Sequence, residues 1–229
     1  MKIDIVTIFP NIFDSFLKKS LLARAQKKRL LTVKTHNLRK WTKDRHKTVD
    51  DRPYGGGAGM VLKIEPIYRA VQFLERKTKN VKRKRIILLS AKGKTFTQKD
   101  ARRLAKYGQI IFICGRYEGV DERVAKYVAD EEISIGNYIL FGGEVPAMVV
   151  IEAVSRLIPG VVAKEESVKN ESFSDKEAKI KEYPQYTRPE VFKARSLKDK
   201  KFKSLKVPKV LLSGDHKKIE EWRKKHSNI

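Results

Sequence analysis

The chain has 229 residues, of which 41% are hydrophobic and 34% are charged, so its composition is that of a globular protein and excludes a disordered one. Lysine and arginine number 52 against 27 aspartates and glutamates, and the resulting formal net charge of +25 favours a polyanion such as nucleic acid as partner. A lysine excess that serves only solubility is the alternative, but many basic residues are clustered, as in "KNVKRKR". The single cysteine, Cys114, excludes an intrachain disulfide, and the first residues lack the pattern of a signal peptide, so we expect a cytoplasmic protein that does not enter a membrane.

Strand and helix patterns alternate along the first two thirds of the chain. The apolar spacing predicts strands over residues 2–8, 30–36, 85–91 and 109–115, and helices over residues 9–29, 65–79, 97–107 and 146–157. The third and fourth strands are short, almost wholly apolar and separated by a helix, as buried parallel strands are. The sequence therefore predicts an α/β fold in which helices cover both faces of a parallel sheet.

The composition changes after residue 162. Residues 163–182 contain few large apolar side chains and cannot bury enough surface to fold alone, so they are predicted to form a flexible linker between domains. A long polar loop with a function is the alternative. Residues 1–162 then form the main domain and residues 183–229 a small, mostly helical one, whose last helix Asp215 is expected to cap.

The stretch "SIGNYILFGGEVPAM", Ser134 to Met148, fits neither a strand nor a helix, because glycines interrupt both and Pro146 favours a helix start. It predicts a short strand that ends at Ile135, a backbone that passes close to something, and a helix from about Pro146. "LLSAKG" and "CGRYEGVDER" also follow apolar strands, and ligands bind at the carboxyl ends of such strands. We expect the three loops to converge on one pocket.

Two other features of the sequence leave alternatives open. Arg116, Glu118, Asp121 and Arg123 are typical of a solvated helix start with local ion pairs as well as of a pocket. The loop "YGGGAGM", Tyr54 to Met60, matches neither a phosphate-binding nor a dinucleotide-binding pattern. Its glycines would let a base or phosphate approach the backbone, and a flexible surface turn is the alternative.

The spacing of the four histidines with one cysteine predicts no metal cluster, and no Ser, His and Asp set has nucleophile-elbow spacing.

Taken in order, several motifs resemble the bacterial tRNA (guanine-N(1))-methyltransferase family over nearly the whole chain. They are "IVTIFP", "DRHKTVDDRPYGGGAGM", "LLSAKG", "CGRYEGVDER", "SIGNYILFGGEVPAM", "SRLIPGV", "YTRPEV" and "LLSGDH". The family methylates the guanosine immediately 3′ of the anticodon, at tRNA position 37. The resemblance implies a SPOUT methyltransferase domain with a C-terminal trefoil knot that binds S-adenosylmethionine. It also implies a tRNA-binding C-terminal domain and a homodimer with each active site shared between subunits.

The resemblance also implies the residues of the two binding sites. Those that bind the cofactor would be Leu89, Ser90, Gly115, Tyr117, Glu118, Ile135, Gly136, Tyr138, Leu140, Gly142, Gly143 and Pro146. Those that grip the target nucleotide and its neighbour would be His46, Asp50, Tyr54, Gly55, Gly56, Gly57 and Gly59. Contacts with tRNA phosphates would fall to lysines and arginines near the C-terminus. The resemblance also implies that the activity depends on Mg²⁺. The sequence has no acidic cluster that would bind the ion, so Mg²⁺ would act through tRNA folding or the charge of the substrate.

Guanine nitrogen 1 carries a proton at neutral pH, so its methylation needs a base and a donor that stabilises negative charge on oxygen 6. By position in the family motifs, Arg156 is the donor and Glu171 the base, where the family normally has aspartate. Asp175 is a second candidate for the base. The stretch "FKARSLKDKKFKSLK", residues 192–206, is longer and more basic than its family counterpart, which should steepen the salt dependence of RNA binding.

Two other functions remain open. An RNA-binding or ribosome-assembly protein of the same fold that has lost catalysis is the main alternative, and Glu171 in place of aspartate keeps it open. The other is an enzyme that modifies another RNA base or a ribose hydroxyl.

Overall fold

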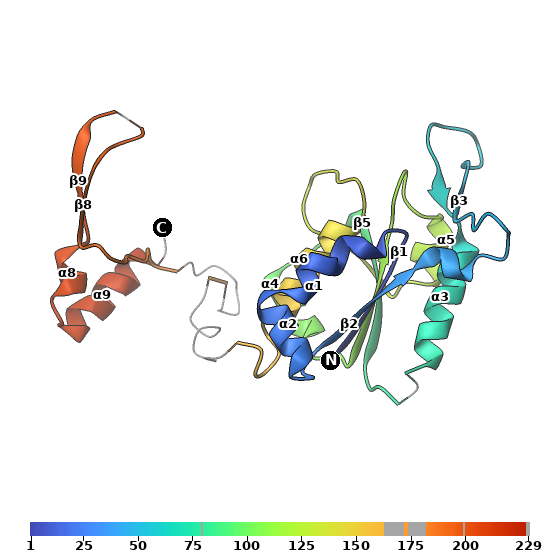
Figure 1. Cartoon of the computed structure of the whole chain (residues 1–229), viewed down its shortest axis with the longest axis horizontal. Coiled ribbons are helices and arrows are strands. Elements are labelled where there is room, and N and C mark those ends of the chain that lie inside the picture. Colours follow the sequence, from blue (N-terminus) through green and yellow to red (C-terminus); the bar gives the residue numbers. More distant parts are fainter. Residues whose placement is uncertain (79, 163–171, 174–181, 199, 228–229) are drawn as a thin grey trace. The chain divides into compact units, whose positions relative to one another are not determined.

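The computed structural model describes residues 1–78, 80–162, 172–173, 182–198 and 200–227 (Figure 1). These residues belong to two compact units, Met1–Val168 and Lys169–Ile229, which are described separately below. The interdomain linker predicted over residues 163–182 lies almost entirely outside the described residues.

A five-stranded sheet with the order β2-β1-β6-β5-β7 forms the centre of the first unit, and every pairing in it is parallel. The strands are β1 (Lys2–Thr7), β2 (Thr32–Asn37), β5 (Lys84–Thr95), β6 (Gln109–Cys114) and β7 (Glu131–Ser134). All six residues of the apolar strand β6 are buried. The structure thus confirms the predicted α/β fold and its four strand regions.

Helices cover both faces of this sheet (Figure 1). Along β6, Ile110 and Phe112 pack in one apolar cluster while Ile111 and Ile113 pack in the other, because successive side chains point to opposite faces. One face is covered by η1 (Pro10–Phe13), α1 (Asp14–Lys18), α2 (Ser20–Lys27), α4 (Gln98–Leu104) and α6 (Glu144–Ser155), and the other by α3 (Ile64–Arg76) and α5 (Glu122–Tyr127). The 3-10 turn η2 (Leu38–Trp41) follows β2 and contacts α3.

The prediction of one helix over residues 9–29 is wrong. The segment divides into η1, α1 and α2, with Lys19 extended and Ser20 at a φ of 61°. The break turns Leu22 and Ala25 into the core and leaves Leu21 41% exposed. The roughly helical spacing of Ile12, Phe16, Leu21 and Ala25 predicts Leu21 on the inner side of a single helix, but the break rotates α2 so that Leu22 is buried instead.

Gly93 allows an irregularity near the end of β5. The pairing of β5 with β7 shifts register between Leu89 and Lys94, and a Cβ atom on Gly93 would lie 2.5 Å from the backbone nitrogen of Ile133. Only glycine lets the two backbones approach so closely. The strand therefore continues beyond the predicted residue 91 to Thr95.

The second unit combines a hairpin with helices. Its strands β8 (Val191–Arg195) and β9 (Phe202–Lys206) pair antiparallel, and α8 (Lys209–Leu212) and α9 (His216–His226) follow. The Asp215 side chain accepts a hydrogen bond of 3.1 Å from the Lys218 amide, which confirms the predicted cap. The hairpin was not expected in a mostly helical domain. In the part of the chain that the structure describes, no helix is both long and apolar enough to cross a bilayer.

Candidate active site

A cavity of about 300 Å³ lies at the carboxyl ends of β5, β6 and β7. Its walls are residues 88–92 of β5, 115–120 after β6, 132–136 at the end of β7, and 138–143 with Pro146 at the start of α6, together with Glu122 and Ala125 of α5 (Glu122–Tyr127). The expected convergence of three strand-end loops is therefore confirmed. The cavity lies where open parallel sheets bind their ligands.

All twelve residues for which the resemblance implies cofactor binding line this cavity. Tyr117 adopts a φ of 60°, a backbone conformation that is rare for a bulky residue and is common near functional sites. Its side chain is half exposed at the cavity. The arrangement places the twelve residues together, and their part in binding a cofactor stays a prediction.

Glycines bring the loop before α6 against the loop after β6. The Gly143 amide donates a hydrogen bond of 2.9 Å to the carbonyl oxygen of Gly115. A Cβ atom on Gly143 would lie 2.8 Å from the Cα atom of Cys114, closer than real Cβ contacts. The backbone that the sequence predicted to pass close to something therefore passes close to the chain itself.

A buried carboxylate joins the two loops to the first strand. Glu144 is fully buried, and its Oε1 atom accepts a hydrogen bond of 2.7 Å from the Thr7 hydroxyl. Its Oε2 atom accepts one of 2.8 Å from Nε of Arg116, whose guanidinium lies 4.9 Å from the centre of the Phe9 ring. Such charge-assisted bonds hold the start of α6 and the wall residue Arg116 in place.

Sequence reasoning missed this ion pair, because it left Arg116 as a candidate for a solvated helix start. One signal was present: Glu144 is the single charged residue between residues 133 and 151. The alternative does hold for Asp121, which caps α5 and binds the Arg123 guanidinium at 2.6 and 2.9 Å. The bonds from Arg123 lower the pKa of Asp121 below its usual value.

The loop predicted to grip the target nucleotide is exposed and adjoins the cavity. It connects β3 (Asp50–Asp51) with β4 (Val61–Leu62), and the Tyr54 side chain at its start is fully exposed. Gly55, Gly56, Gly57 and Gly59 have φ angles between 82° and 120°, which side chains rarely adopt. His46 is exposed in the segment before β3, and Asp50 is half-buried.

Hydrogen bonds fix this loop to the cavity wall. The Glu118 amide donates to the Met60 carbonyl oxygen and the Leu62 amide donates to that of Gly119, each at 3.0 Å. A Cβ atom on Gly59 would lie 2.5 Å from Cγ of Glu118. Glu118 therefore lines the cavity on one side and contacts the glycine loop on the other.

Of the two residues assigned to catalysis, the structure describes only Arg156, and it places Arg156 away from this cavity. Arg156 is half-buried and caps the C-terminal end of α6, whereas the cavity adjoins the N-terminal end. Twelve helical residues separate the two ends, a rise of about 18 Å. Glu171 and Asp175 lie outside the described residues.

Other reactive groups in the described part of the chain form no metal site. Among those residues no group of three or more His, Cys, Asp and Glu side chains is arranged to hold an ion. Cys114 is buried, and burial raises the pKa of its thiol well above the usual value.

The fold and the cavity define an α/β protein with a cavity at the carboxyl ends of a parallel sheet, the usual ligand site of such folds, beside an exposed glycine loop. The family model described as tRNA (guanine-1)-methyltransferase TrmD matches residues 1–229, and the chain belongs to this family.

Curated relatives agree with this membership. A "tRNA (guanine-N(1)-)-methyltransferase" of Carboxydothermus hydrogenoformans is 51% identical over 227 residues, which cover 99% of this chain and 83% of that protein. Proteins of the same description from Dictyoglomus turgidum and Endomicrobium trichonymphae are 50% and 47% identical. Each alignment covers 99% of this chain, with 85% and 94% of the respective relative.

Proposed function

We propose that this protein is a tRNA (guanine-N(1))-methyltransferase that transfers a methyl group from S-adenosylmethionine to nitrogen 1 of the guanosine immediately 3′ of the anticodon, at position 37. One observation carries the proposal beyond family membership. The cavity and the exposed glycine loop meet at Glu118, which supports a donor site in the cavity beside an acceptor site at the loop.

The lining of the cavity fits S-adenosylmethionine. Its volume of about 300 Å³ is at the lower end of the range for small-molecule sites. Lys92 and Arg116 in the wall are paired with Glu122 and Glu144. Glu118 and Glu132 line the cavity without an ion-pair partner among the described residues, and carboxylates suit a ligand with a positively charged sulfur and an ammonium group.

Backbone groups would make most of the contacts with the adenosine. Gly115, Gly142 and Gly143 keep the wall free of side chains at the point where two loops touch. In the finer fold that we propose, a trefoil knot, the segment around Gly143 is the one that wraps the adenosine. The bonds from Phe96 to Ser134 and from Gly143 to Gly115, of 2.8 and 2.9 Å, support that packing of crossing segments.

The chemistry divides between two side chains and the donor. When bound, S-adenosylmethionine supplies the methyl group on its sulfur. The carboxylate of Glu171 removes the proton from guanine nitrogen 1, and the guanidinium of Arg156 stabilises the negative charge on oxygen 6. Glutamate is one methylene longer than the usual aspartate, and a displacement near 1 Å can cost about a hundredfold in rate. Side-chain placement at Glu171 is therefore the most sensitive part of the proposal.

We further propose that two chains form a homodimer in which each active site is shared. The separation of Arg156 from the cavity of its own chain supports this arrangement. The apolar helix α6 also leaves Val145 53% and Val149 44% exposed, next to η1, where Ile12 is 44% exposed. Burial of these side chains against a second copy would remove them from water.

The test is methyl transfer from labelled S-adenosylmethionine to a tRNA transcript with guanosine 3′ of the anticodon. We expect the wild type to be active and Glu171→Gln and Arg156→Ala to lose most of the activity. Glu171→Asp, which restores the usual residue of the family and keeps a carboxylate, should remain active. Arg24→Ala, at an exposed site on α2, is the matched control and should remain active. A transcript with adenosine at that position should not accept methyl groups.

A wild type that binds tRNA and cofactor but transfers no methyl group would contradict the proposal and favour the RNA-binding alternative. Transfer to the adenosine transcript would instead show a different target base.

A further inference from the structure

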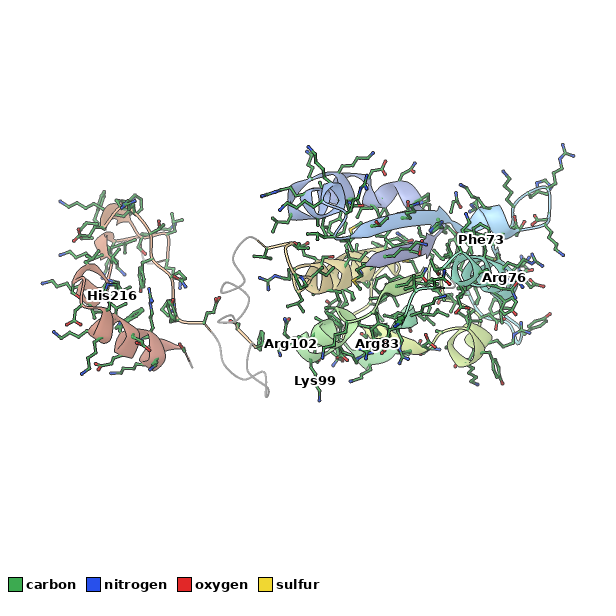
Figure 2. The ribbon with its side chains drawn as sticks, turned by 90° about the horizontal axis from the view of Figure 1, so that it is seen from below. Phe73, Arg76, Arg83, Lys99, Arg102 and His216 are labelled. Carbon is green, nitrogen blue, oxygen red and sulfur yellow. The ribbon has the colours of Figure 1, made fainter. Side chains whose placement is uncertain are left out.

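A second groove lies at the other edge of the sheet and shares no residue with the cavity. It has a volume of about 500 Å³ and lies between β1, the edge strand β2, the turn η2 and the C-terminal part of α3. Its lining residues are Lys2, Asp4, Lys34, His36, Lys40, Trp41, Phe73, Leu74 and Lys77. Figure 2 shows Phe73 on α3 with Arg76 close by.

The groove is strongly basic. Lys34, Lys40 and Lys77 are exposed, and they form no salt bridge with any residue that the structure describes. The carboxylate of Asp4 is fully buried at the base and is already engaged by His36, Gln109 and Lys2 at distances of 2.7 to 3.1 Å. The acidic group is therefore satisfied internally, and the exposed charge is positive.

Aromatic side chains form one wall between these lysines. The Trp41 and Phe73 rings pack edge to face with their centres 6.0 Å apart, and Phe73 is 42% exposed. The ammonium group of Lys77 lies 4.4 Å from the centre of the Phe73 ring. Grooves that bind single-stranded nucleic acid combine these two elements, cations for the phosphates and aromatic rings for the bases.

The chain leads from the groove to the loop predicted to grip the target nucleotide. η2 leads directly into residues 42–49, which carry the exposed residues Lys43, Arg45 and Lys47, and then into β3. Arg39 donates a hydrogen bond of 3.0 Å to the Lys47 carbonyl oxygen, and Arg69 donates one of 3.1 Å to that of Trp41. The basic path is thus held against the domain.

We propose that this groove is a second RNA-binding site, in which Lys34, Lys40 and Lys77 hold backbone phosphates and Phe73 and Trp41 pack against an unpaired base. The proposal rests on the proposed function, because tRNA is the RNA that would occupy the groove. The nucleotides bound in the groove would belong to the same RNA strand as the target guanosine. The groove would then add affinity and register without taking part in methyl transfer.

The experiment measures binding of an end-labelled tRNA transcript by fluorescence anisotropy at several salt concentrations. The groove variant is Lys34→Gln, Lys40→Gln and Lys77→Gln combined. The matched control is Lys27→Gln, Lys28→Gln and Lys106→Gln, which removes the same charge from exposed sites outside the groove. A separate Phe73→Leu variant removes the ring but keeps an apolar side chain, and thermal unfolding checks that each variant is folded.

For the groove variant we expect the slope of log affinity against log salt concentration to become less steep by about 2 to 3, since each of the three lost phosphate contacts removes about 0.7 to 0.9. Phe73→Leu should weaken binding at least about fivefold with the slope unchanged. The inference is overturned if the groove variant and the control variant bind tRNA with equal affinity and slope, or if the wild type does not bind tRNA.

Competition with inorganic phosphate, at constant ionic strength, tests whether the groove binds the phosphates of the tRNA backbone or only a small free anion. If it abolishes the difference between the two triple variants, the groove binds a small anion and the RNA assignment is wrong. Absent methyl transfer with a retained difference in tRNA binding would refute the proposed function and leave this inference standing.

Discussion

The close approach at Gly143 allows a quantitative prediction for Gly143→Ala. The backbone of Gly143 has a φ of −79°, so alanine introduces no conformational strain there. Its Cβ atom would lie 2.8 Å from Cα of Cys114 and 3.1 Å from the nitrogen of Gly115, and both are backbone atoms of a loop that flanks the cavity. Ordinary contact begins near 3.4 Å, so the loops must separate by about 3.4 − 2.8 = 0.6 Å.

Separation of this size has two expected effects. Overpacking of a well-packed site costs about 1–3 kcal/mol, and for a chain of this length each kcal/mol lowers the melting temperature by about 2–4 °C. The 2.9 Å hydrogen bond from Gly143 to Gly115 would lengthen to about 3.5 Å, at which such a bond is weak. Because both residues line the cavity, we expect the affinity for S-adenosylmethionine to fall with the melting temperature.

Differential scanning calorimetry and isothermal titration calorimetry with S-adenosylmethionine measure the two effects. Gly115→Ala is the comparison, because its Cβ atom would meet nothing closer than Cγ1 of Val120 at 3.4 Å. That variant should keep the melting temperature of the wild type. A Gly143→Ala protein with wild-type stability and cofactor affinity would refute the reasoning that the two loops are in contact there.

Three further outcomes follow from other contacts. In Gly93→Ala the new Cβ atom would meet the backbone of β7 at 2.5 Å, and calorimetry should show a loss of at least about 1–3 kcal/mol; unchanged stability would contradict the register shift. Burial would raise the pKa of Glu131, but hydrogen bonds from Arg103 and Arg85 outweigh it and lower that pKa below 4.5. The resulting stability is present above pH 4.5 and is lost as the pH falls through the lowered pKa, so acid unfolding of Glu131→Gln should lack this component. Cys114 should react with a thiol reagent at pH 8 only after denaturant is added, because burial raises the pKa of its thiol; fast reaction of the native protein would disprove that burial.

The parts of the fold that the sequence predicts well are those whose pattern is set by neighbouring residues. The run "QIIFIC" is apolar at every position after the first, and β6 is accordingly buried on both faces. The helix over residues 9–29 failed because its break at Lys19 depends on how Leu22 meets the sheet, which is a contact between distant segments. The hairpin of β8 and β9 was missed because four of its ten strand residues are basic and nearly all ten are exposed, so no apolar face marks the strands.

In the candidate site, too, features set by neighbouring residues were predictable and contacts between distant segments were not. Strand-end position and glycine content were sufficient to predict that three loops converge, because parallel strands end at one edge of a sheet. The identity of the twelve lining residues came from the family resemblance. The pair of Arg116 with Glu144 spans 28 residues, so the isolated charge of Glu144 in an apolar stretch singles out the carboxylate but does not identify its partner.

The hydrogen bond between Thr7 and Glu144 has a consequence for the order of folding. It links residues 137 positions apart, so the loop around the cavity is complete only when the first strand has docked beside β6 and α6 has formed. During synthesis β1 is made long before Glu144, so Thr7 cannot form this hydrogen bond until α6 has been synthesised. No residue of β1 lines the cavity. Ligand bound in the cavity should nevertheless slow hydrogen exchange in β1, because opening of that strand would also disrupt the cavity wall.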